Sequence, residues 1–224
     1  MSEEGEWALQ SEPRHLRQHQ IIHPDMAGMD VIIAGAGMIG GWTAHALSRA
    51  VKKVHIFDPG EVEAINTGNQ PYIQDHVGMA KVQALGLPIE YHFKTFPPTA
   101  RLRFNWENTV VVSAVDSMSG RAANAEWCKG MEIPLFLDGR IQGELAVLAT
   151  VVDQHYDAYL SDLPSDDEVE DVPCGQEGTA YCGMWLASQI TATINQWCKD
   201  ITPKPMRVHH VALGIDIPQG TSPS

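Results

Sequence analysis

The sequence predicts an α/β domain whose mostly parallel sheet is extended by antiparallel strands. The first observation is an apolar run of strand length, 31–34, that meets a glycine turn and a helical stretch and is followed by a second apolar run, 54–57. Strand, helix and strand in this order form a parallel pair with a right-handed crossover. The second observation is that no helix separates the extended stretches 133–137 and 144–153, which favours antiparallel pairing.

The remaining elements follow from periodicity and composition. Apolar runs predict further strands at 91–95, 109–115 and 207–213. Helices are expected at 41–49, 121–129 and 184–197, and core packing accounts for the apolar stripe of the last one. We expect residues 1–28 to form an N-terminal helical arm, residues 29–224 a single domain, and the acidic stretch 160–178 a solvated crossover loop within it.

Composition excludes several classes of function. The 224 residues carry a formal net charge of −13, which disfavours nucleic acid as a partner because nucleic-acid binding requires a cationic surface. No apolar run approaches the roughly 18 residues that cross a bilayer, and the acidic N-terminus lacks a signal-peptide core, so we expect a cytoplasmic protein without a membrane partner. The four cysteines form no C-x-x-C pair, so neither a disulfide framework nor a zinc site is expected.

A G-x-G-x-x-G pattern follows the first predicted strand and opens the first predicted helix. Gly35 permits a tight turn, Gly37 lets the backbone approach phosphate, and Gly40 allows close packing of helix on strand. Asp58 ends the next strand, where a carboxylate accepts hydrogen bonds from ribose hydroxyls and disfavours a 2′-phosphate. These residues predict a Rossmann-like domain that binds a nucleotide, and both NAD and ATP satisfy them.

Three further stretches carry the motifs of a known family. They are Asp58 followed by Val62-Glu63, Asn66, Gln70 and Gly78-x-x-Lys81; Arg14-His-Leu-Arg17-Gln18; and Ser113-Ala-Val-Asp116-Ser-Met-Ser-Gly-Arg121. They resemble the ThiF/MoeB/HesA family, the bacterial relatives of ubiquitin-activating enzymes. That family shows an Asp, then V-E-x-x-N-x-x-R-Q and G-x-x-K, together with R-Y-x-R-Q and D-x-x-D-N-x-x-x-R. The resemblance covers roughly residues 14 to 150.

This resemblance implies an ATP-dependent adenylyltransferase. It would activate the C-terminal carboxylate of a small ubiquitin-like protein, sulfur-carrier protein or peptide, with Mg²⁺ and as a homodimer. Lys81 would neutralise phosphate charge and Asp116 would hold Mg²⁺. Arg17 would reach the γ-phosphate of the other protomer. Asn66, Asn69 and Gln70 would contribute neutral contacts to the nucleotide.

Two positions leave the function open. Asn69 stands where the family has arginine, so it lacks the charge and the planar fork of that residue. Arg14, Arg101, Arg103 or Arg121 would have to supply the charge, or the chain is a weak or inactive nucleotide-binding scaffold. The third hypothesis is that the chain is an NAD-dependent oxidoreductase. Cys174 lies after the crossover, where a thiol of lowered pKa would form a thioester or persulfide, although most single cysteines are packing residues.

Overall fold

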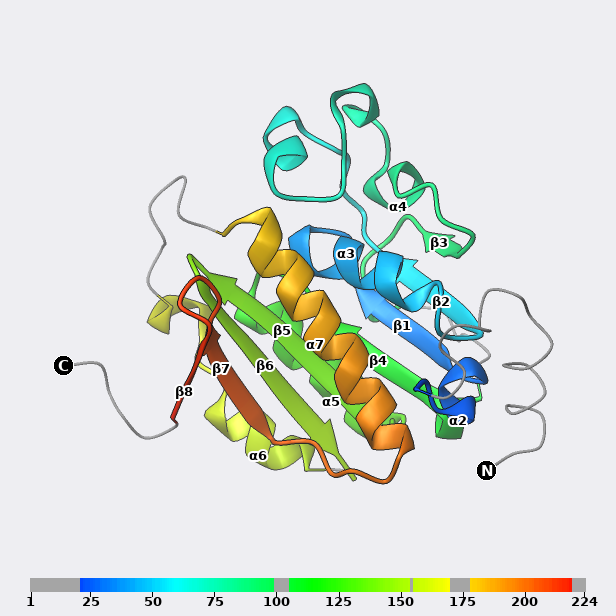
Figure 1. The fold of residues 1–224 in the computed structure, drawn as a ribbon, viewed down its shortest axis with the longest axis vertical. Helices are drawn as coiled ribbons and strands as arrows, with labels where there is room; N and C mark the ends of the chain where they lie inside the picture. Colours follow the sequence, from blue (N-terminus) through cyan, green and yellow to red (C-terminus); the bar gives the residue numbers. More distant parts are fainter. Residues whose placement is uncertain (1–20, 99–104, 154, 170–177, 219–224) are drawn as a thin grey trace.

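The computed structural model describes residues 21–98, 105–153, 155–169 and 178–218. Their strands form one 8-stranded sheet in the order β3-β2-β1-β4-β5-β6-β7-β8 (Figure 1). The strands are β1 (Asp30–Ala34), β2 (Lys53–Phe57), β3 (Glu90–His92), β4 (Thr109–Ser113), β5 (Leu135–Gln142), β6 (Leu145–Val152), β7 (Met206–His210) and β8 (Ile215–Ile217). The strands from β3 to β5 are parallel, and β6, β7 and β8 extend them in antiparallel fashion. The predicted fold class is confirmed.

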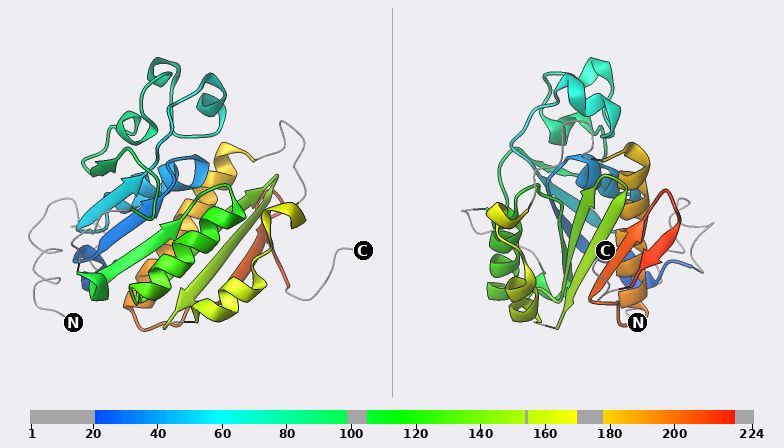
Figure 2. Two further views of the ribbon diagram at one scale, coloured as in Figure 1. Left: turned by 180° about the vertical axis from the view of Figure 1, so that it is seen from behind. Right: turned by 90° about the vertical axis from the view of Figure 1, so that its left-hand side faces the viewer.

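Helices cover both faces of the sheet. On one face α3 (Met38–Leu47) packs against α7 (Ala180–Cys198), and on the other lie α5 (Met118–Gly130) and α6 (Tyr156–Asp162) (Figures 1 and 2). Because β1 and β4 are covered on both faces, their side chains are buried almost throughout. Each face of the sheet therefore carries its own hydrophobic core cluster.

The segment between β2 and β3, residues 58–89, forms an insert that stands above the sheet in Figure 1. It contains the 3₁₀ turns η2 (Ala64–Gly68) and η3 (Gln74–His76) and the short helix α4 (Lys81–Ala84). At its base an isolated bridge pairs Glu61 with Ala80, and the Lys81 amide donates to the Gly60 carbonyl at 2.9 Å. The part of the insert between Glu61 and Ala80 thus starts and ends close to the carboxyl end of β2.

Several element boundaries differ from those predicted. α5 begins at Met118, three residues before the predicted start, because Ser117 caps it and accepts a hydrogen bond from the Gly120 amide at 3.1 Å. Residues 160–162, predicted as loop, are the last turn of α6. That helix is anchored by the fully buried Tyr156, whose hydroxyl donates to the Ile133 carbonyl at 2.9 Å. The three-residue strand β8 was not predicted, because its alternation is too short to detect.

The described end of the predicted N-terminal arm packs on α7. The helix α2 (Pro24–Ala27) buries Met26, and the amide of His23 donates to Asn195 at 2.8 Å. Residues 1–20 of the arm lie outside the described residues. Within the described part of the chain, no helix combines the length and apolarity needed to cross a bilayer.

Candidate nucleotide-binding site

The glycine turn between β1 and α3 has the geometry that its residues predict. Gly35 has a φ of 97°, and its amide donates to the Phe57 carbonyl at 2.8 Å. A Cβ on Gly40 would lie 1.9 Å from the Gly35 oxygen, so only glycine allows this approach of helix to strand. Gly37 is the N-cap of α3, and a Cβ there would meet nothing within 4 Å. The first amides of α3 therefore lie beside open space, the arrangement that binds anionic groups.

Asp58 joins this turn to the start of the insert. One carboxylate oxygen accepts from the Ala36 amide at 2.7 Å, and the other accepts from the Gly60 amide at 2.7 Å. The sequence predicted that this carboxylate binds ribose. Its first role in the fold is to hold two backbone segments together. Each oxygen keeps acceptor capacity for a further donor.

Tyr72 makes a second link between the glycine turn and the insert, and it was not predicted as a site residue. Its hydroxyl lies 2.6 Å from the Ala36 oxygen and 3.2 Å from the Lys81 oxygen, so it links the turn to α4. Burial raises the pKa of Tyr72 above its ordinary value, and the negative charge of Asp58 adds to this. The hydroxyl therefore stays protonated and donates. Nothing in the local sequence marked it, because the apolar residue beside it, Ile73, is exposed.

A cavity of about 750 Å³ lies at the carboxyl edge of the parallel strands, between the glycine turn, the insert and the start of α5. Six predicted site residues line it: Gly35, Gly37, Asp58, Gln70, Lys81 and Asp116. The aromatic ring of Phe57 and that of Phe96 add an apolar wall, with ring centroids 5.3 Å apart. The side chain of Lys81 passes close to the Cα of Gly60, where a Cβ would lie 3.7 Å from Lys81 Cδ.

Gln70 supplies an unused polar atom in this cavity. Its Oε1 is buried and has no hydrogen-bond partner among the described residues. A buried acceptor without a partner costs free energy, which a donor on a bound ligand would recover. The cavity residues therefore fit a nucleotide: open helix amides at Gly37, an unsatisfied acceptor at Gln70, and a cation at Lys81.

Other predicted site residues do not line the cavity. Gly40 lies beneath the turn, against Gly35. Asn66 lies within η2, where its side-chain oxygen accepts from the amide of the N-cap residue Glu63 at 2.9 Å. Asn69 donates through Nδ2 to the Gly178 carbonyl at 3.3 Å. Arg17 and Cys174 lie outside the described residues.

The acidic stretch reaches the start of α5, beside Asp116. Asp166 accepts hydrogen bonds from the Met118 amide at 2.5 Å and from the Ser119 amide at 3.3 Å. These bonds lower the pKa of Asp166, with the Ser119 side-chain bond as the largest cause. A carboxylate at a helix N-terminus is favourable because it meets unpaired amides. This contact brings part of the acidic stretch to the rim of the cavity.

Arg121, one of the proposed substitutes for the missing arginine, is held in a buried ion pair. Its Nη1 donates to Asp138, which also accepts from Arg140 Nε at 2.6 Å and from the Tyr159 hydroxyl at 2.9 Å. Asp138 is fully buried and the exposed fraction of Arg121 is 4%. Arg121 lines the cavity, but its charge is already paired with Asp138.

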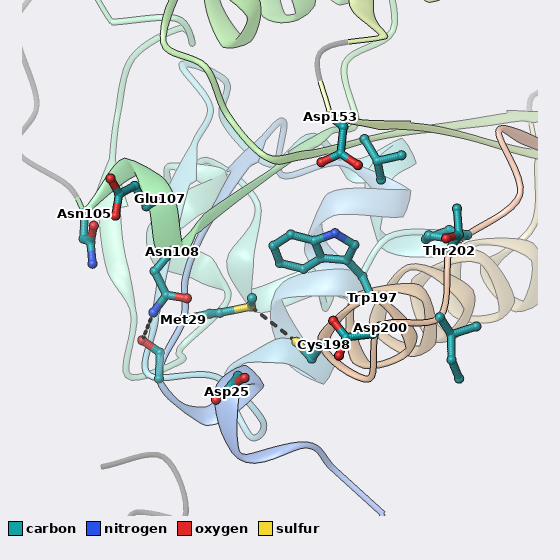
Figure 3. A pocket seen from close by; sticks show the side chains of 14 residues that line it. Asp25, Met29, Asn105, Glu107, Asn108, Asp153, Trp197, Cys198, Asp200 and Thr202 are labelled. Atoms are coloured by element: carbon teal, nitrogen blue, oxygen red, sulfur yellow. Dashed lines mark hydrogen bonds between the residues drawn. The ribbon is translucent and has the colours of Figure 1, made fainter. Parts of the chain in front are cut away.

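A second cavity, of about 680 Å³, lies at the opposite edge of the sheet, before β1 and β4 (Figure 3). Trp197 faces it together with the carboxylates of Glu107, Asp153 and Asp200. None of the predicted site residues that the structure describes lines it. Among the described residues, no group of three or more His, Cys, Asp or Glu side chains is arranged to hold a metal ion.

Comparison with known proteins gives a curated relative, solved structures of the same fold and a matching family. The tRNA threonylcarbamoyladenosine dehydratase of Escherichia coli (strain K12) is 26% identical over 132 residues, which are 53% of this chain and 49% of that protein. The chain thus spans about half the length of this curated relative.

Two solved structures share the fold. E. coli MccB with ATP superposes with a TM-score of 0.68 at 12% identity, over 97% of this chain and 72% of that chain. The E. coli tRNA N6-threonylcarbamoyladenosine dehydratase in complex with ATP gives a TM-score of 0.61 at 16% identity, over 89% of this chain and 96% of that chain. The sequence profile of the ThiF family matches residues 24–221, which is nearly the whole chain. The protein belongs to the ThiF family.

Proposed function

We propose that this protein is an ATP-dependent adenylyltransferase that activates the C-terminal carboxylate of a small ubiquitin-like protein, sulfur-carrier protein or peptide. The observation that carries the proposal is that one cavity is lined by the glycine turn at Gly37, by Gln70, by Lys81 and by Asp116. These residues come from three separate segments of the chain: the glycine turn, the insert and the turn before α5. Each has a use in binding a triphosphate.

Adenylation joins a carboxylate to the α-phosphate and releases pyrophosphate, so the protein contributes positioning and charge neutralisation. In the proposed site the amides that follow Gly37 hold phosphate oxygens, and Lys81 neutralises their charge. Mg²⁺, when bound, would neutralise phosphate charge further. Asp116 is the carboxylate that would hold it, since Mg²⁺ is commonly bound through one or two carboxylates together with substrate phosphates.

ATP is favoured over NAD because the cavity presents a lysine and a carboxylate beside the glycine turn, and a triphosphate with Mg²⁺ uses both for charge neutralisation. Two structural neighbours, MccB and the tRNA dehydratase, were crystallised with ATP. MccB was also crystallised with MccA, and this supports a peptide or protein substrate. The formal charge of −13 disfavours tRNA as the substrate, in spite of the name of the curated relative.

Exchange of labelled pyrophosphate into ATP tests the proposal, with Mg²⁺ and candidate carrier proteins that end in Gly-Gly. We expect exchange with the wild type, and in Lys81→Ala an exchange rate that is lower by roughly two orders of magnitude or more. Lys52→Ala is the matched control, since Lys52 is exposed near the opposite edge of the sheet and removes the same charge. Exchange that survives in Lys81→Ala contradicts the proposed role of this lysine.

The same preparation separates the alternatives. Thermal stabilisation by ATP without exchange would support a nucleotide-binding scaffold. This is the alternative that asparagine at position 69, in place of the family arginine, suggests. Stabilisation by NAD but not by ATP would support an oxidoreductase instead. Either outcome overturns the proposed activity while leaving the nucleotide cavity in place.

A homodimer in which Arg17 acts on the partner's nucleotide is part of the proposal. It is supported by the family motif around this residue, and complementation tests it. We expect Arg17→Ala and Lys81→Ala each to lose exchange, and a mixture of the two to regain part of it, since mixed dimers then contain one intact site. A mixture that stays as inactive as its components contradicts action in trans.

A further inference from the structure

Asn69 is turned away from the nucleotide cavity. Its Nδ2 donates to the carbonyl of Gly178 at 3.3 Å, although the two residues are 109 positions apart. Its own carbonyl oxygen lies 3.5 Å from Trp42 Nε1 on α3. Asn69 does not line the cavity, whereas the next residue, Gln70, does. The side chain therefore fastens the insert to the segment that leads into α7.

The acceptor of this hydrogen bond has a fixed position. Gly178 has a φ of 147°, and a Cβ there would lie 2.7 Å from both Ile141 Cγ2 and Met38 Cε. Its main chain is thus packed tightly between β5 and α3, in a conformation that favours glycine. The bond from Asn69 to the Gly178 carbonyl therefore ties the insert to a segment that packs closely on β5 and α3.

The residues after Gln70 are fastened as well. Pro71 packs on α3 so closely that a Cβ on Gly41 would lie 2.6 Å from its Cγ. The Tyr72 hydroxyl lies 2.6 Å from the Ala36 carbonyl. Gln70 is thereby held from both sides, by Asn69 before it and by Pro71 and Tyr72 after it, with its unsatisfied Oε1 at the cavity.

We propose that Asn69 is a positioning residue, which holds Gln70 in the nucleotide cavity through its hydrogen bond to Gly178 and makes no contact with the nucleotide itself. The inference rests on the proposed function, because it assumes that the cavity binds ATP. It also explains why an amide serves at a position where related sequences carry a charge. The short side chain of asparagine matches the fixed distance to the Gly178 carbonyl.

The proposal makes Asn69→Arg harmful. Arginine replaces the short amide that donates to the Gly178 carbonyl, so the link in its present geometry is lost and the added cation does not compensate. We expect Asn69→Arg to weaken ATP binding. A gain in ATP affinity or exchange rate would instead show that a missing charge limits this site, and it would overturn the proposal.

Two variants with matched controls test the positioning role directly. Asn69→Ala removes the donor, and Asn69→Asp removes it while preserving shape and placing oxygen against oxygen. Thr67→Ala and Thr67→Asp are the controls, because Thr67 lies on the same turn and its hydroxyl bonds only within it, to Ala64 at 2.8 Å. By calorimetry we expect ATP to bind about fivefold more weakly to Asn69→Ala, the loss of one hydrogen bond, and more weakly still to Asn69→Asp. Both Thr67 variants should bind ATP as the wild type does, and equal effects at positions 67 and 69 would overturn the proposal.

Hydrogen exchange separates this inference from the proposed function. Without nucleotide, Asn69→Ala should speed amide exchange in the insert and in residues 178–182, while β1 and β4 stay protected. Unchanged exchange in both segments contradicts the link. Failure of the wild type to bind ATP contradicts the proposed function, and with it the positioning of Gln70 for a nucleotide, whatever the exchange result.

Discussion

The hydroxyl of Tyr72 lies 2.6 Å from the carbonyl oxygen of Ala36, and both residues are buried. This contact joins the tip of the glycine turn to the insert that carries Lys81. The two segments that frame the proposed phosphate site thus move as one body. The contact also places a buried phenol next to Asp58, which accepts from the amide of the same Ala36.

Tyr72→Phe should destabilise the protein by roughly 1–3 kcal/mol, because the Ala36 carbonyl is left buried without its donor. Urea unfolding measures this. The variant should also bind ATP less tightly, since the turn and α4 lose their link. A stability equal to that of the wild type would mean that another donor reaches the Ala36 oxygen.

Alkaline pH provides a second test of the same phenol. Burial, then the charge of Asp58, raises the folded-state pKa of Tyr72 above its ordinary value of 10.0. A group whose pKa is raised on folding contributes its full stability below the ordinary pKa and loses that contribution as the pH rises through the folded-state value. Wild-type stability should therefore fall more steeply above pH 10.0 than that of Tyr72→Phe. Parallel curves would contradict this.

Alanine substitutions at Gly37 and Gly40 should have different effects, the first on ATP affinity and the second on the stability of the fold. In Gly37→Ala the methyl group enters open space, so stability should change by less than about 0.5 kcal/mol while ATP affinity falls. In Gly40→Ala the methyl group would meet the Gly35 oxygen, so about 3 kcal/mol or more of stability should be lost. Denaturation and calorimetry on both variants check this. Unaltered ATP binding by Gly37→Ala would mean that phosphate does not approach this turn.

Asp138→Asn should be among the most destabilising conservative changes in the sheet. Asp138 is fully buried and neutralises Arg121 while also accepting from Arg140, so its loss leaves buried positive charge uncompensated, at a cost of about 3–5 kcal/mol. The exposed pair Lys129–Asp157 gives the contrast, and Asp157→Asn should change stability little. Similar effects of the two changes, measured by urea unfolding, would contradict the buried pair's role.

Mild acid should weaken the fold through a histidine pair. His55 Nδ1 lies 3.3 Å from His92 Nε2, and burial, followed by the charges of His92 and Lys53, lowers the pKa of His55 from 6.5 to about 4, against the opposing effect of Glu90. A histidine with a depressed folded-state pKa stabilises the fold above the ordinary pKa and loses that contribution as the pH falls towards the folded-state value.

Stability should accordingly decline between pH 6.5 and about 4, and the decline should be smaller in His55→Leu. Urea midpoints across this range provide the measurement. The matched control is His76→Leu on the insert, which removes a histidine that is not buried in the core. An equal decline in wild type and His55→Leu would place the acid-sensitive group elsewhere.

Local patterns were sufficient for seven of the eight strands and for several of the residues that line the cavity. Strands that are buried on both faces, such as β1 and β4, are apolar throughout, so they can be recognised without knowing what packs on them. The glycines of the turn are required by the local backbone geometry, which involves only a few neighbouring residues. Lys81 and Asp116 were found because they follow motif spacing, and they meet in one cavity because the carboxyl ends of parallel strands share one edge.

Contacts between distant segments could not be predicted in the same way. Asn69 and Gly178, Asp166 and Met118, and Tyr72 and Ala36 are separated by 109, 48 and 36 residues. Each pair joins a side chain to a backbone group. No periodicity marks such a bond, because any polar side chain in an irregular segment has the same local pattern whichever backbone group it reaches.

The sequence by itself determined the longer strands and helices, the glycine turn and the residues proposed to bind phosphate, because short-range periodicity reflects burial and backbone conformation. The tertiary structure alone decided which of these residues face the cavity. It directed Gln70 inward and Asn69 towards Gly178, and it paired Arg121 with Asp138. Those choices depend on how the insert packs against α3 and bonds to Gly178, and this is set by close packing between segments far apart in the chain.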